Sequence, residues 1–113
     1  MSDEQAALRL PGVRSAVLSW HEHAAAVDTV LLDGFHALKH ALRFGADVHV
    51  AVSSDKDAVL RLAADLAPDL TADLAARVTQ VPAAALRELV ARVHPTGVAA
   101  LAARPGRAGR RGP

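Results

Sequence analysis

The stretch of the chain that decides the fold is residues 27–44, VDTVLLDGFHALKHALRF. Its first part is a run rich in valine and leucine, which predicts a buried strand over residues 27–32. Asp33-Gly34 is typical of a turn, and residues 35–44 follow with the spacing of an amphipathic helix. Gly45 comes directly after that helix, where glycine commonly ends one. The stretch therefore predicts a strand, a tight turn and a helix that faces the sheet.

The same alternation of strand and helix continues on both sides of this stretch. Further strands are expected at residues 47–53, 77–81 and 98–102. Further helices are expected at residues 13–25, from Ser54 or Asp55 to Leu66, at 70–76 and at 82–92, with a short one at 6–10 stopped by Pro11-Gly12. Strands that alternate with helices predict an α/β fold, with a four-stranded, mostly parallel or mixed sheet and helices on both faces.

Length and composition restrict the classes of protein that the chain can belong to. At 113 residues it is long enough for one domain with one core. It contains no cysteine, which excludes disulfides and thiolate metal sites and fits a reducing, cytoplasmic location. The acidic, polar start does not read as a signal peptide, and no apolar run approaches the ~20 residues of a membrane helix. We therefore expect no contact with a membrane.

The net charge of +1 conceals an uneven distribution of charge. Residues 104–113 carry four arginines and no acid, whereas the rest of the chain carries nine basic and twelve acidic residues. We expect three parts: an N-terminal helical segment packed on the domain (1–26), the α/β domain (27–103), and a disordered basic tail or truncated linker (104–113). Because the body is mildly acidic, any contact with a polyanion must be local.

A stripe of basic side chains runs along the helix at residues 35–44. His36, Lys39, His40 and Arg43 are spaced i, i+3, i+4 and i+7, so they share one face of the helix. No acid lies on this helix, and the turn before it offers backbone N–H groups to a phosphate, unless Asp33 caps the helix. Three interpretations fit the stripe: a solvated surface, an RNA-binding face, or a metal site on His36 and His40. No third ligand at a recognisable spacing supports the metal site, so none is expected.

The basic tail has two interpretations. Arg104 and Arg107 lie in a glycine- and proline-rich context that suits either a linker or an electrostatic arm for RNA. No nucleophile-elbow serine and no glycine-rich phosphate loop is present, so the sequence offers no catalytic residue of its own.

Two segments together carry a resemblance to a known family. These are residues 30–52, with Asp33-Gly34, Ala41-Leu42 and Gly45-Ala46, and residues 93–101, VHPTGVAAL. The order and spacing of these motifs resemble the N-terminal substrate-binding domain of SpoU-type (TrmH-like) RNA 2′-O-ribose methyltransferases. The resemblance covers roughly residues 13–104.

The resemblance implies a three-layer α/β/α sandwich shared with kink-turn-binding ribosomal proteins, and docking of structured RNA, ribosomal or transfer. The strand–turn–helix start contacts RNA in such proteins, which corresponds here to Gly34, His36 and Lys39. The S-adenosylmethionine-binding catalytic domain would follow this part of the chain, so the resemblance implies no cofactor and no catalysis within it. A homodimer stays open, because enzymes of the family pair mainly through that following domain. The competing interpretation is a protein–protein or dimerisation scaffold without RNA binding.

Overall fold

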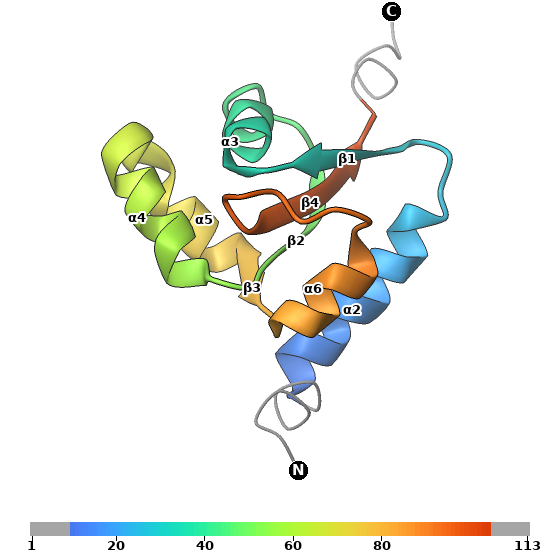
Figure 1. The fold of residues 1–113 in the computed structure, drawn as a ribbon. Coiled ribbons are helices and arrows are strands. Elements are labelled where there is room, and N and C mark those ends of the chain that lie inside the picture. The colour runs from blue at the N-terminus through green and yellow to red at the C-terminus, as the bar shows by residue number, and fades with distance from the viewer. Residues whose placement is uncertain (1–9, 105–113) are drawn as a thin grey trace, which may run out of the picture.

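The computed structural model describes residues 10–104 and shows a mixed α/β arrangement (Figure 1). The strands are β1 (Thr29–Asp33), β2 (Val48–Ser53), β3 (Val78–Gln80) and β4 (Val98–Ala103). The helices are α2 (Pro11–Ala24), α3 (Phe35–Arg43), α4 (Lys56–Leu66), α5 (Thr71–Arg77) and α6 (Ala83–Leu89), with a 3-10 turn η1 (Pro68–Leu70) before α5. The expected alternation of strands and helices is confirmed.

The four strands form one mixed sheet in the order β1-β4-β2-β3. Strand β2 pairs with β3 in parallel, whereas β4 is antiparallel to both of its neighbours, β1 and β2. The last strand therefore enters the middle of the sheet, and its residues 98–102 are all buried. This position explains why the final strand is an almost uninterrupted run of alanine, valine and leucine.

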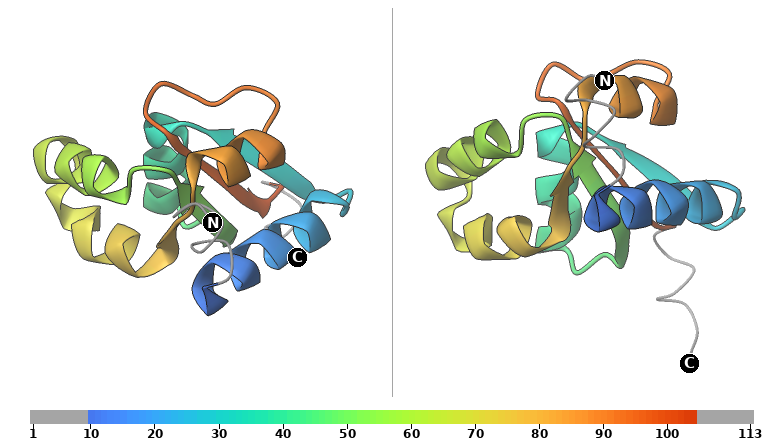
Figure 2. Two further views of the ribbon diagram at one scale, coloured as in Figure 1. Left: turned by 60° about the horizontal axis from the view of Figure 1, so that its bottom comes forward. Right: turned by 90° about the horizontal axis from the view of Figure 1, so that it is seen from below.

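Helices cover both faces of this sheet (Figure 2), and each face holds an apolar cluster. On one face α2 and α6 pack against Val52, Ala99 and Leu101, with Trp20 of α2 buried among them. On the other face α3, α4 and α5 pack against Ala51, Val98 and Ala100, with Phe35 of α3 fully buried. Residues 11–24 are thus a helix packed on the sheet. The short helix expected at residues 6–10 lies almost entirely outside the described residues.

Several boundaries differ from the expectation. Helix α2 begins at Pro11 and not at residue 13, since the first turn of a helix has no need of the N–H that proline lacks. Strand β1 begins at Thr29 and includes Asp33, which pairs with Ala99, while Val27 is exposed. Helix α6 ends at Leu89, because Val90 is buried in an extended conformation.

Candidate functional site

The turn between β1 and α3 depends on Gly34. This residue has φ of 98° and lies buried, and its N–H donates to the carbonyl of Val98 on β4 at 3.1 Å. The imidazole of His94 lies over its Cα, so that a Cβ at Gly34 would meet three ring atoms at 2.8 Å. The backbone angle and the close approach of His94 both demand glycine here.

Thr96 caps the start of α3. The N–H of Phe35 donates to Thr96 Oγ1 at 3.0 Å, across 61 residues of sequence. Thr96 Oγ1 lies 2.9 Å from His94 Nδ1, and the N–H of Thr96 donates to the same nitrogen at 3.1 Å. Because Nδ1 accepts the N–H of Thr96, it carries no hydrogen, and the Thr96 hydroxyl must donate to it as well. This hydrogen-bond pattern assigns the ring proton of His94 to Nε2. The loop at residues 94–97 is thereby held against the start of α3.

The network at Thr96 changes the expectation for this helix start. The N-cap residue of α3 is Gly34, which has no side chain that could cap the helix. Asp33 is the last residue of β1 and does not cap the helix either. The first N–H of the helix is occupied by Thr96. The surface here is therefore made jointly by α3 and the loop at residues 94–97, not by bare N–H groups after a turn.

The four basic side chains of α3 do not form the uncompensated stripe that the sequence suggests. His36 and His40 are exposed and line a groove beside the helix. Arg43 donates to Asp69 of η1 at 3.0 Å, with exposed fractions of 43% and 60% for the two side chains. Lys39, on the same side of the helix as Arg43, is partly buried. An ion pair this exposed contributes at most about 1 kcal/mol, so Arg43 can exchange Asp69 for another anion.

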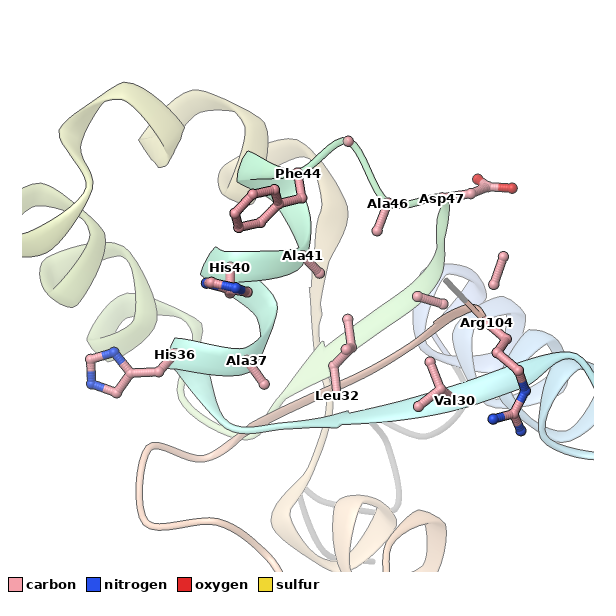
Figure 3. Close-up of a pocket in the computed structure, with 13 residues that line it drawn as sticks. Val30, Leu32, His36, Ala37, His40, Ala41, Phe44, Ala46, Asp47 and Arg104 are labelled. Atoms are coloured by element: carbon pink, nitrogen blue, oxygen red, sulfur yellow. The ribbon is translucent and has the colours of Figure 1, made fainter. Parts of the chain in front are cut away.

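The groove has a volume of about 980 Å³ and lies between α3 and the sheet (Figure 3). Its lining is mostly small and apolar and comes from α3, β1, the end of β4 and the connection to β2. The apolar lining residues are Val30, Leu32, Ala37, Ala41, Phe44, Ala46, Ala102 and Ala103. The polar lining residues are His36, His40, Asp47 and Arg104. Phe44 is 75% exposed, and its ring centroid lies 4.5 Å from that of His40.

The structure brings together candidate residues that are far apart in the sequence. His36, His40 and Arg104 line the same groove, although Arg104 lies at the end of β4. Its N–H donates to the carbonyl of Asp28 at 2.6 Å, which continues the pairing of β4 with β1. Arg107 lies outside the described residues. Gly34 is buried and acts on the surface only by allowing His94 to pack against the start of α3.

Sequence reasoning missed three residues of this region. Residues 94–97 belong to a segment that carries the family resemblance, but no local pattern shows that His94 and Thr96 meet the start of α3. Phe44 was expected only as the last residue of a helix. Its position i+4 after His40 and i+8 after His36 places it on their exposed face, and this signal could have identified it.

Other clusters of chemistry-bearing side chains are sparse in the part of the chain that the structure describes. His23 of α2 stacks on His49 of β2 with ring centroids 4.2 Å apart, and its Nδ1 lies 2.9 Å from the carbonyl oxygen of Ser19. Among residues 10–104 no group of three or more potential ligands is placed to hold a metal. No helix in that range has the length and apolar character to cross a membrane. Comparisons of the chain with family models, with curated proteins and with solved structures give no match.

Proposed function

We propose that this chain is an RNA-docking domain that uses the exposed face of α3. The observation that carries the proposal is the convergence of His36, His40 and Arg104 on one groove from two distant segments. Lys39 and Arg43 extend the same helix face on its other flank. Five cationic or titratable side chains thus lie around one helix, although residues 1–103 as a whole carry more acidic than basic side chains.

The proposal includes the wider resemblance described above. The helices on both sides of the mixed sheet support a three-layer α/β/α sandwich of the kind found in kink-turn-binding ribosomal proteins. In this view the chain is the cytoplasmic substrate-binding part of a SpoU-type ribose methyltransferase, and it supplies docking without chemistry. Binding of S-adenosylmethionine and methyl transfer would belong to a separate catalytic domain.

Each side chain has a distinct part in the proposed complex. Lys39, Arg43 and Arg104 contact phosphates, which give affinity that falls with salt. His36 and His40 lie at the mouth of an apolar groove, where imidazole can stack on an unpaired base or bond to a 2′-hydroxyl. Gly34 contributes by letting His94 and Thr96 approach the helix start.

The ion pair of Arg43 with Asp69 provides a sharp test. Replacing both Lys39 and Arg43 with alanine should weaken binding of a structured RNA and flatten its dependence on salt. The opposite change, Asp69→Asn, frees Arg43 from its partner and should strengthen binding. Anisotropy titrations at two salt concentrations measure both effects.

A matched control removes two exposed cations elsewhere. Arg61 and Arg87 lie exposed on α4 and α6, so their double alanine variant changes the net charge equally and leaves α3 intact. Binding that falls equally in the two double variants would show a general charge effect and would reject the α3 face. Wild-type protein that binds no RNA would reject the function itself.

The alternative is a protein–protein interaction domain, and one observation favours it. The floor of the groove is apolar, and Phe44 beside it exposes most of its side chain. Exposed apolar surface of this kind commonly marks a site of protein contact. Light scattering combined with the RNA titration separates the two functions.

A further inference from the structure

Strand β1 forms one open edge of the sheet (Figure 1). Within residues 10–104 its only strand neighbour is β4, because the order of strands begins with β1. The strand has no proline, no lysine and no bulge, three of the devices that keep an edge from pairing, and its one charged residue, Asp33, lies at its end. Its central residue, Leu31, exposes 47% of its surface. The edge is therefore built in a way that permits another strand to add to it.

The hydrogen bonds at the two ends of β1 reveal which backbone groups point outward. The N–H of Gly34 donates to Val98, and the N–H of Arg104 donates to Asp28. In an antiparallel pair such bonded positions alternate with unbonded ones, so Val30 and Leu32 also bond to β4. Thr29, Leu31 and Asp33 therefore direct their N–H and C=O groups to the open edge, where the N–H of Thr29 is taken by Ala26 at 3.3 Å.

We propose that β1 pairs with β1 of a second copy of this chain, antiparallel and centred on Leu31. In this register Leu31 lies opposite Leu31 of the second copy, and the two exchange a pair of N–H···O=C bonds. The N–H of Asp33 donates to the carbonyl of Thr29 in the second copy. The symmetry-related bond, from Asp33 of the second copy to Thr29 of the first, completes the two-fold arrangement. The result is an isologous dimer with a continuous eight-stranded sheet.

The side chains favour this register and this partner. Val30 lies opposite Leu32 of the second copy on the α3 side, so apolar residues meet apolar residues. The carboxylate of Asp33 lies opposite Thr29 of the second copy, a small polar residue, on the face away from α3. The two Asp33 side chains stay about 14 Å apart, since four residues of strand separate them. A register centred on Leu32 would instead place Asp33 opposite Leu31.

The same pairing accounts for the apolar groove. A two-fold axis perpendicular to the sheet places both α3 helices on one face, beside each other across the junction. Each groove floor, which includes Val30 and Leu32, then lies against the second copy. Leu31 points to the opposite face, so a substitution at Leu31 changes the pairing without altering the α3 side chains proposed to contact RNA.

Sedimentation of the wild type and two lysine variants tests the dimer. The wild type should show a concentration-dependent rise from 11.8 kDa to twice that mass. Leu31→Lys places two like charges opposite each other and should raise the dissociation constant at least ~10-fold. Leu66→Lys is a matched control, because Leu66 on α4 is also 47% exposed and lies away from β1. A wild type that stays monomeric, or equal weakening by both variants, overturns the proposal.

A cysteine variant tests the register directly. The chain contains no cysteine, so Leu31→Cys introduces a single thiol per copy, and the dimer places the two thiols directly opposite each other. Their Cα separation of about 5.5 Å is within the range of a disulfide. Mild oxidation should give covalent dimer from Leu31→Cys and little from Leu66→Cys. Equal cross-linking of both variants would reject this interface.

Discussion

Gly34 is the residue at which the smallest change should have the largest effect on stability. Alanine at this position meets the ring of His94 at 2.8 Å and must adopt φ of 98°. We expect Gly34→Ala to lower the free energy of unfolding by ~2–4 kcal/mol, since strain and overpacking add. Urea unfolding followed by circular dichroism measures the loss.

Gly45→Ala separates the two causes. Gly45 also has positive φ, at 73°, but a Cβ there meets nothing within 4 Å. Its alanine variant should lose only ~1 kcal/mol, which is the cost of the backbone conformation alone. Adding His94→Ala to Gly34→Ala should recover part of the larger loss, and strictly additive losses would show that His94 does not press on this residue.

The turn at Gly34 also shows where sequence reasoning succeeds and where it ends at the scale of residues. Asp33-Gly34 predicted the turn because glycine readily adopts the positive φ that such a turn requires. The role of His94 could not be predicted, because the two residues are 60 positions apart and meet only through the pairing of β1 with β4. Local chemistry is readable in the sequence, whereas contact across the fold is not.

At the scale of elements, the start of α4 gives a prediction about helix capping. The side chain of Asp55 accepts from the N–H of Ala58 at 3.1 Å, as expected for an N-cap aspartate. Asp55→Ala should therefore lower the free energy of unfolding by ~1 kcal/mol. Asp57 lies in the first turn of α4 without a capping bond, and Asp57→Ala should cost only ~0.3 kcal/mol. Thermal unfolding of both variants checks the difference, and equal losses would contradict the capping role.

The elements themselves were largely predictable, and their ends were not. Every expected strand and every helix expected after residue 12 is present, because period and apolar content are local properties. The ends depend on what the chain meets next. Val90 could continue a helix, but its buried place among α2 and the sheet requires an extended backbone that ends α6.

At the scale of the whole molecule, strand order decides the properties that matter for function. Nothing in the sequence places β4 between β1 and β2, yet this insertion leaves β1 at the edge and brings Arg104 beside α3. The pairing of Arg43 with Asp69 likewise depends on how η1 packs near α3. Sequence reasoning could therefore identify most of the candidate cations and histidines, but not how they group.

The arginines beyond Arg104 give the last prediction, which concerns the charge of the whole chain. Arg107, Arg110 and Arg111 carry three of the positive charges, and without them the chain is net acidic. If they form an electrostatic arm for RNA, replacing all three with glutamine should reduce the slope of log affinity against log salt by ~2–3. Glutamine keeps the length of the chain, so anisotropy titrations over a range of salt report the lost charge alone. An unchanged slope would identify the segment as a linker, because counterion release requires contact between each cation and a phosphate.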